Sequence, residues 1–267
     1  MLTINNLSKI FNQGTINEKK ALDHLQLHLE PEDFVTVIGS NGAGKSTLMN
    51  VIAGTFPPDQ GQIIIDDKDV TKLPSYKRAG FISRVFQDPM SGTAASMTIE
   101  ENLIMALKRG EPRRLRWALN GKDRNFFQEE LKKLNLGLEG RLTTKVRLLS
   151  GGQRQALTLL MATLKKPQLL LLDEHTAALD PKTAEKVLEL TCTVTKQSHL
   201  TTLMITHNLE QALSVGNRTI MMHDGRIILD LKGAERANMT MNRLLEMFEK
   251  ASGVHMNNDR MMLAGTF

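Results

Sequence analysis

The sequence predicts an α/β fold with a largely parallel core sheet, an antiparallel β portion at the N-terminus and an inserted α-helical subdomain. Short β-branched or leucine-rich runs alternate with helix-forming segments, which is typical of strands joined by crossover helices. Hydrophobic residues make up 41% of the 267 residues and only one is a cysteine. A chain of this length can bury its core without disulfide bonds.

The predicted elements follow one another in a regular order. Strands are expected over residues 35–38, 62–65, 81–86, 169–172 and 200–205, and a hairpin over 215–230 turns at Asp224-Gly225. Helices are expected over 45–53, 99–108, 125–135, 151–165, 181–197 and 240–250.

The region between the third and fourth strands differs from the rest. Residues 90–149 contain helical patterns and few strand signals, so we expect a helical subdomain there. The core is then formed by 1–89 and 150–250, and together these parts make a single domain over residues 1–250. Residues 251–267 are expected to form a weakly ordered tail.

The composition excludes some classes of function but does not identify one. Lys and Arg outnumber Asp and Glu by 34 to 29, a net charge of +5, which suits a nucleotide, a nucleic acid or an anionic membrane surface. One Trp and one Tyr argue against a stacking platform for single-stranded nucleic acid. Apolar runs are all shorter than the about 18 residues a membrane span needs.

A glycine-rich loop follows the first of these strands and precedes a helix. It matches the phosphate-loop pattern with the residues Gly39, Ser40, Asn41, Gly42, Ala43, Gly44, Lys45 and Ser46. Its backbone N–H groups and the helix N-terminus would bind phosphate. Thr47, the next residue, is also predicted to bind the nucleotide. Lys45 would contact the β- and γ-phosphates of ATP, and Ser46 would ligate Mg²⁺. A glycine-rich turn without a ligand is the alternative, but the flanking strand and helix favour a P-loop NTPase core.

An acidic pair ends the leucine-rich strand at 169–172. Carboxylates at the carboxyl end of such a strand lie where open α/β sheets bind ligands. Asp173 would hold Mg²⁺ through water, and Glu174 would act as the general base on the attacking water. An acidic pair that merely starts a surface loop is the alternative.

The segment Leu149-Ser150-Gly151-Gly152-Gln153 lies 20 residues or more before the acidic pair. With the phosphate loop and the acidic pair in this order, it resembles the signature motif of ABC ATPases, and the resemblance covers about residues 2–250. It implies that Ser150, Gly151, Gly152 and Gln153 of one chain contact ATP on a second copy, so that a head-to-tail dimer encloses two ATP molecules.

Other residues have roles that only the resemblance implies. Gln87 matches the Q-loop glutamine, which contacts Mg²⁺ or the water, and residues 178–180 match the D-loop. His207 matches the switch histidine, which hydrogen-bonds the γ-phosphate and orients Glu174. Phe11 stands where the family places an aromatic residue against adenine. Each has an alternative. Gln87 would be a polar residue at a strand end, His207 a structural histidine, and Phe11 a core residue of an N-terminal hairpin.

Two positions depart from the family pattern. His175 stands where many members have proline, and the helix after the signature reads Arg154-Gln155-Ala156-Leu157 instead of a basic, Ala/Ile-rich run. Neither departure removes a catalytic group. His175 either alters the approach of the D-loop or marks a subfamily without effect.

The resemblance implies an ATP-hydrolysing subunit of a membrane ABC transporter. The lack of a spanning segment then requires separate transmembrane permease subunits, which would dock near Gln87 and the 90–150 region. The chain resembles small bacterial import ATPases, so an importer of a small solute such as an amino acid is expected, with an extracellular substrate-binding protein. The chain is expected at the cytoplasmic face of the membrane as a peripheral subunit, and nucleic acid is not an expected partner.

Two other functions remain open at this point. An exporter or lipoprotein-release ATPase would use the same motifs with a different permease. A non-transport clamp or switch would also bind ATP, although the presence of Glu174 disfavours it because holding ATP needs no general base. The basic stretch 108–116 would face lipid headgroups or permease carboxylates, or would be a solvated loop.

Overall fold

The computed structural model describes residues 1–111 and 119–252, which fall into two compact units. Unit 1 comprises residues 1–78 and the described residues from 200 onwards, and unit 2 comprises residues 79–199. The predicted subdomain boundaries at 90 and 149 both lie within unit 2 and stay a prediction. Most of the predicted tail, and residues 112–116 of the basic stretch, lie outside the described residues.

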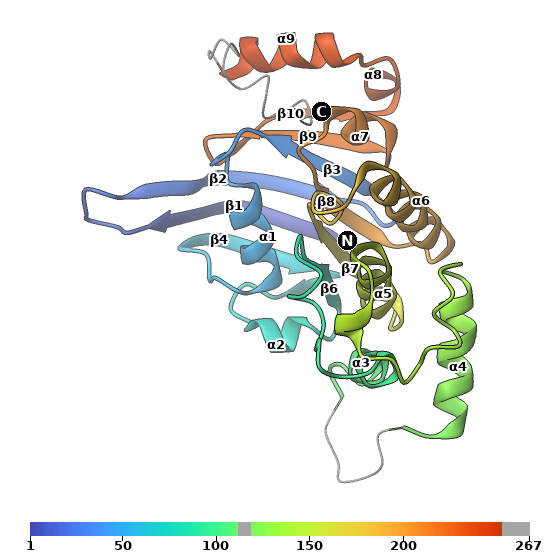
Figure 1. The fold of residues 1–267 in the computed structure, drawn as a ribbon. Helices are drawn as coiled ribbons and strands as arrows, with labels where there is room; N and C mark the ends of the chain where they lie inside the picture. The colour runs from blue at the N-terminus through green and yellow to red at the C-terminus, as the bar shows by residue number, and fades with distance from the viewer. Residues whose placement is uncertain (112–118, 253–267) are drawn as a thin grey trace. The chain divides into compact units, whose positions relative to one another are not determined.

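Unit 1 contains the antiparallel sheet that the sequence predicts near the N-terminus. Its strands are β1 (Leu2–Phe11), β2 (Lys19–Leu29), β4 (Gln60–Ile65) and β5 (Lys68–Asp69), in the order β2-β1-β4-β5. Leucines 25, 27 and 29 are buried on alternate positions of β2, the period of a sheet with one covered face. The paired ends of β1 and β2 extend beyond the rest of the unit (Figure 1).

The second group of strands in unit 1 is parallel apart from its edge. Strand β3 (Phe34–Gly39) pairs in parallel with β8 (Thr201–Ile205) and with β9 (Arg218–His223), and β10 (Arg226–Lys232) pairs antiparallel with β9. Asp224 and Gly225 both have positive φ angles, 44° and 76°, as the predicted hairpin turn requires.

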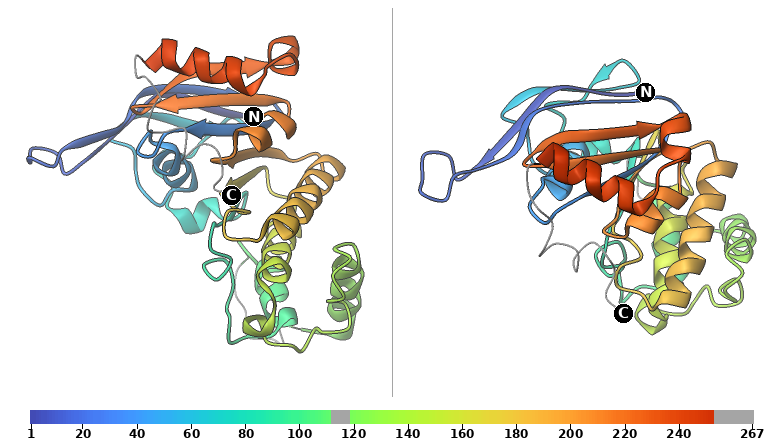
Figure 2. Two further views of the ribbon diagram at one scale, coloured as in Figure 1. Left: turned by 45° about the horizontal axis from the view of Figure 1, so that its top comes forward. Right: turned by 90° about the horizontal axis from the view of Figure 1, so that it is seen from above.

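Helices cover the strands of unit 1. They are α1 (Lys45–Ala53), α2 (Ser75–Arg78), α7 (Leu209–Ser214), α8 (Gly233–Ala237) and α9 (Met241–Ser252). Helix α9 lies across β9 and β10 (Figure 2), where Leu244 and Phe248 join Met221 and Leu231 in one buried cluster.

Unit 2 joins a parallel strand pair to a helical cluster. Strands β6 (Ile82–Val85) and β7 (Leu169–Asp173) pair in parallel, and the helices are α3 (Ile99–Leu107), α4 (Gly121–Lys132), α5 (Gly151–Thr163) and α6 (Pro181–Gln197). A 3₁₀ turn, Val146–Leu148, precedes α5. Buried side chains of α3, α4 and α5, such as Leu103, Phe127 and Leu160, form one core.

Most helix ends follow the predicted positions, and α4 is the exception. It begins at Gly121 and not near 125, because Asn120 and Asp123 form a reciprocal capping box that stabilises an earlier start. No helix among residues 1–111 and 119–252 is long and apolar enough to cross a membrane.

A buried arginine holds the C-terminal end of α1. Arg78 is 1% exposed, and its Nη1 donates to the carbonyl oxygens of Val51 (2.8 Å) and Ile52 (2.7 Å). Nε and Nη2 donate to the carbonyl oxygens of Leu73 (2.8 Å) and Thr71 (3.0 Å). The last carbonyl groups of a helix have no partner within it, so this guanidinium satisfies them and complements the negative end of the helix dipole.

Replacing Arg78 with Met should lower the free energy of unfolding by about 3–5 kcal/mol, since several buried carbonyl oxygens lose their donor. Urea denaturation followed by circular dichroism measures this loss. Lys77→Met is the matched control, because Lys77 is the exposed neighbour in the same helix and its replacement should change stability by less than about 0.5 kcal/mol. Equal effects of the two substitutions would contradict the clamping role of Arg78.

Candidate functional site

The glycine-rich loop occupies the tight turn between β3 and α1, and two of its glycines approach other strands closely. Gly44 has a φ of 99°, and a Cβ atom there would overlap the carbonyl oxygen of Ala21 in β2. A Cβ atom on Gly39 would overlap the carbonyl oxygen of Met222 in β9. Gly44 has no side chain with which to cap α1, and the N-terminus of a helix is a favourable position for an anion.

The lysine of the loop is held by the loop itself. Lys45 is 5% exposed, and its Nζ donates to the carbonyl oxygens of Gly39 (2.6 Å) and Ser40 (3.0 Å). This places an ammonium group on the inner side of the loop, where phosphate oxygens would complete its coordination. The contact of Lys45 with the β- and γ-phosphates stays a prediction.

A second lysine lies beside the loop and was not predicted from the sequence. The Nζ atom of Lys19 is 3.1 Å from the position that a Cβ on Gly42 would take. Lys19 begins β2, and its register opposite Phe11 in β1 brings it there. The position of Lys19 beside the loop depends on this hairpin register, which the sequence does not reveal.

Phe11 lies at the same end of the β1–β2 hairpin as Lys19. Its ring meets Phe56 edge-to-face, with centroids 5.6 Å apart, and Lys9 Nζ is 5.7 Å from its centroid. The ring is partly exposed. The ring therefore packs against Phe56 and is not a fully buried core residue. Stacking on adenine stays a prediction.

The predicted switch histidine lies in the turn between β8 and α7. Within unit 1, the N–H of Thr206 donates to the carbonyl oxygen of Val37 in β3 (3.2 Å), and Asn208 caps α7 by accepting from the N–H of Gln211. Because Val37 is two residues before Gly39, these bonds hold His207 at the carboxyl end of the strand that leads into the phosphate loop.

In unit 2, the carboxyl end of β7 presents the acidic pair. An arginine that the sequence did not single out contacts it: Arg84 Nη2 is 2.5 Å from Asp173 Oδ2. The parallel register of Arg84 with Leu171 places Arg84 and Asp173 on one face of the strand pair, and the guanidinium also lies 4.7 Å from the centroid of Phe86. Asp173 therefore has a cationic partner of its own.

Buried polar side chains contact or directly follow the segments that carry Gln87 and Glu174. Gln155, a fully buried residue of α5, donates from Nε2 to the carbonyl oxygen of Phe86 (3.4 Å), and the next residue, Gln87, is exposed. His175, directly after Glu174, is 2% exposed. Burial lowers the pKa of His175 to about 4, so its imidazole is neutral at pH 7.

The signature segment forms the N-terminus of α5. Ser150 is the N-cap: its Oγ accepts from the N–H of Gln153 (3.3 Å), and the Gln153 side chain accepts from the N–H of Ser150 (3.2 Å). The Ser150 hydroxyl keeps its own proton for donation, and Ser150 and Gly151 are exposed. A Cβ atom on Gly152 would overlap the side chain of Thr183 at the start of α6, so the two helices approach closely there.

Asp180 of the predicted D-loop is the N-cap of α6. Its Oδ1 accepts from the N–H of Thr183 (3.1 Å), and hydrogen bonds from Thr183 lower the pKa of Asp180. Pro181 follows at the first helical position, as is typical of helix starts.

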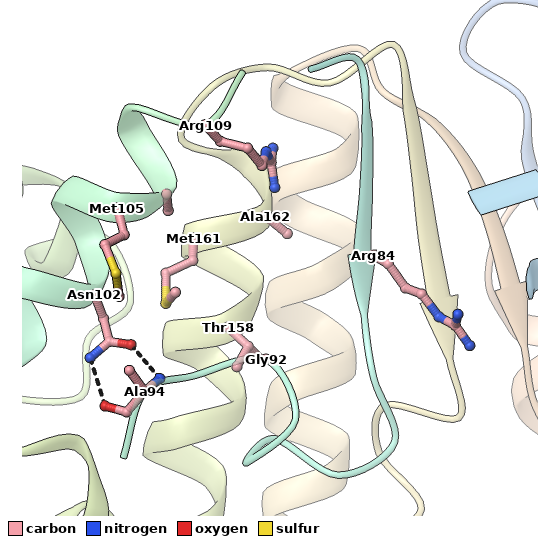
Figure 3. Close-up of a pocket in the computed structure, with 10 residues that line it drawn as sticks. Arg84, Gly92, Ala94, Asn102, Met105, Arg109, Thr158, Met161 and Ala162 are labelled. Carbon is pink, nitrogen blue, oxygen red and sulfur yellow. Dashed lines mark hydrogen bonds between the residues drawn. The ribbon is translucent and has the colours of Figure 1, made fainter. Parts of the chain in front are cut away.

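A pocket of about 270 Å³ lies in unit 2 between α3, α5 and the segment after β6 (Figure 3). Met105, Met161 and Ala162 give it apolar walls, and Asn102 is fixed by two hydrogen bonds with Ala94. Arg109 also lines it and donates to Ser83 Oγ (2.6 Å), so this member of the basic stretch is turned inward and is not a solvated loop residue. Arg84 points away from the other labelled residues.

The sequence and the fold both match known proteins. The family model described as ABC transporter matches residues 22–177, more than half of the chain. The chain belongs to the ABC transporter family. It is an ATP-binding subunit with ATPase activity, as the signature, the phosphate loop and the acidic pair predict.

Two curated relatives match this ABC ATPase over most of its length. It is 47% identical over 251 residues to a tyrosine transport ATP-binding protein of Clostridioides difficile (strain R20291), with 94% of this chain and 100% of the relative covered. It is 35% identical to the thiamine import ATP-binding protein ThiQ of Yersinia pseudotuberculosis serotype I (strain IP32953), with 78% and 85% covered.

Solved structures share the fold of this ABC ATPase. A dimeric ATP-binding cassette in a post-hydrolysis state with ADP and Pi has a TM-score of 0.73 and 28% identity, with 87% of this chain and 98% of that chain covered. The ADP conformation of another ATP-binding cassette has a TM-score of 0.76 and 27% identity, with 93% and 98% covered. The predicted fold class, a P-loop NTPase core with an antiparallel N-terminal portion, is confirmed.

Substituting Gly44 with Ala should abolish detectable ATP binding by this ABC ATPase, because the added Cβ must displace either β2 or the start of α1. Gly14→Ala is the matched control: Gly14 also has a positive φ, 76°, but its added Cβ meets nothing within 4 Å. The control should lose only about 1–3 kcal/mol of stability from backbone strain and bind ATP normally. Isothermal titration calorimetry distinguishes them, and unchanged ATP affinity of the Gly44 variant would refute the assignment.

Proposed function

We propose that this ABC ATPase hydrolyses ATP as a head-to-tail dimer and thereby powers the import of a small solute, an amino acid such as tyrosine. The observation that carries the proposal is the full-length similarity, at 47% identity, to a protein named for tyrosine transport. The thiamine import relative supports the import direction more broadly. The exposed start of the signature helix, Ser150 and Gly151, and the phosphate loop supply the two kinds of surface that such a dimer brings together.

The chemistry follows from the groups at each position. Residues 39–47 bind the phosphates through backbone N–H groups and Lys45, and Phe11 stacks on adenine. Glu174 accepts a proton from water as the water oxygen attacks the γ-phosphorus and ADP leaves. His207 donates a hydrogen bond to the γ-phosphate and orients Glu174.

The residues proposed for Mg²⁺ fit that ion by their chemistry. Ser46, Asp173 and Gln87 supply hydroxyl, carboxylate and amide oxygens, which are the hard donors that Mg²⁺ prefers. When bound, the ion neutralises charge on the phosphate oxygens. Arg84 holds the Asp173 carboxylate in a defined orientation through its 2.5 Å contact.

The second copy of the chain completes each site. Ser150 has a hydroxyl proton to donate, and the α5 N-terminus adds its own N–H groups, so this segment suits the γ-phosphate of ATP held by the partner. The post-hydrolysis relative with ADP and Pi is dimeric, which supports this assembly. ATP is then part of the interface, and its hydrolysis releases the two copies.

The pocket between α3 and α5 is proposed as the contact for the permease. Exposed Met105 and partly buried Met161 offer apolar contact, and Arg109 offers a cation to a carboxylate or carbonyl group. A cytoplasmic helix of a transmembrane permease is the proposed occupant. With this contact the chain would be a peripheral subunit at the cytoplasmic face of the membrane, and an extracellular substrate-binding protein would deliver the solute.

Changing Glu174 to Gln should lower ATP turnover by about 10²–10⁴-fold while preserving ATP binding, because the amide cannot accept the proton. The variant should accumulate as an ATP-bound dimer in size-exclusion chromatography. Lys45→Ala should instead weaken ATP binding and give no such dimer. Normal hydrolysis by the Glu174 variant would refute its role as general base.

Introducing Glu at Met105 should abolish co-purification with the permease, because a charge then lies in the apolar wall of the pocket. ATP binding by the isolated chain should stay unchanged. Met241→Glu is the matched control, since Met241 is 45% exposed on α9 against 46% for Met105, and it should leave the complex intact. Pull-down from detergent-solubilised membranes measures both, and a retained complex with the Met105 variant would rule out the pocket as the docking site.

A further inference from the structure

We propose that His175 is a positioning residue: it fastens the turn that carries Glu174 to the middle of α6 through a buried hydrogen bond with Thr191. The proposal rests on the general-base role proposed for Glu174. It assigns a function to the residue at which this chain departs from the proline of its family.

The turn after β7 contains an unfavourable backbone conformation at Glu174. Glu174 has a φ of 47°, in the left-handed region that residues with a Cβ atom rarely occupy. The N–H of Ala177 donates to the Glu174 carbonyl oxygen (2.9 Å), which closes the turn. Such a conformation persists only where surrounding contacts hold it, so the neighbouring contacts determine where the carboxylate lies.

The direction of the His175 hydrogen bond follows from the partners of Thr191. The Thr191 hydroxyl has one proton, and it donates that proton to the carbonyl oxygen of Val187 (2.8 Å). It therefore accepts from His175 Nε2 at 3.0 Å, so Nε2 carries the proton of the neutral ring. The tautomer of His175 is thereby defined by the fold.

Helix α6 is a firm anchor for this bond. Val187, Thr191 and Thr195 recur every four residues and are all buried, so they form the covered face of the helix. The helix is capped by Asp180, and its first turn lies against Gly152 of α5. His175 therefore connects the Glu174 turn to a helix fixed at its start and along one face.

Proline and histidine would restrain position 175 in different ways. A proline ring restrains the backbone at position 175 covalently, whereas His175 restrains it through its side chain. A residue that does neither should leave the Glu174 carboxylate less well placed. Proton abstraction would then slow, while ATP binding, which depends on other groups, would not change.

The test measures kcat and KM for ATP in variants of the full chain. His175→Ala should lower kcat by about tenfold or more and change KM by less than about twofold. His175→Gln should restore kcat to within about threefold of the wild type, because its amide N–H₂ can reach Thr191 as Nε2 does. His175→Pro should retain most turnover through its backbone restraint.

A double-mutant cycle isolates the hydrogen bond. Thr191→Val keeps the shape of the side chain but removes the acceptor, so it should lower kcat about as much as His175→Ala. The double variant should be no slower than either single variant. Thermal unfolding and ATP binding of each variant show whether the fold is intact, and Thr191→Val and His175→Gln keep the buried volume nearly constant.

The outcomes separate this proposal from the one on which it rests. A wild-type kcat in a folded His175→Ala variant, while Glu174→Gln is inactive, would overturn the positioning role alone. Additive losses from His175→Ala and Thr191→Val would also overturn it, as would equal changes in kcat and KM or a total loss of turnover in His175→Pro. Normal turnover in Glu174→Gln would overturn both proposals.

Discussion

The tight fit of Gly44 between α1 and β2 is the constraint on which the nucleotide site depends. Gly44 fits against β2 only without a Cβ atom, and it stands at the N-terminus of α1, a position that favours a bound anion. Gly39 fits against β9 for the same reason. The far end of α1 is held by the buried guanidinium of Arg78. The strands of unit 1 therefore position a short helix. Its N-terminus offers N–H donors to an anion, and the carbonyl oxygens at its C-terminus accept from a buried cation.

Unit 2 uses the same helix-end chemistry with side-chain caps. Ser150 and Asp180 each accept a backbone N–H bond at the start of a helix, and each leaves polar atoms exposed to a partner. Arg84 contacts the Asp173 carboxylate, and in our proposal His175 restrains the backbone after Glu174 through Thr191. Residues around the acidic pair are thus constrained by contacts within the same unit.

Local signals predicted much of this arrangement. Helix α1 was predicted at its observed bounds because helix-forming residues end at Gly54, and the structure does give Gly54 a positive φ of 77°. The Asp224-Gly225 turn specified its hairpin. The residues that support the site were not predictable in this way. Arg84 meets Asp173 across 89 positions, and Gln155 meets Phe86 across 69, so only the strand register and helix packing bring them together. The capping signal of Asn120 for α4 is local, but the next apolar residues begin later, so the predicted start fell too late.

In the proposed transporter, partner proteins select the solute and this chain supplies the driving force. Reconstitution of the untagged complex, with whatever membrane protein co-purifies, into vesicles that contain ATP tests these roles most directly. We expect a multi-spanning protein in the complex and, with the substrate-binding protein supplied, ATP-dependent uptake of labelled tyrosine or another small solute. Recovery of the untagged protein without any multi-spanning partner, or solute movement only in the opposite direction, would contradict these roles.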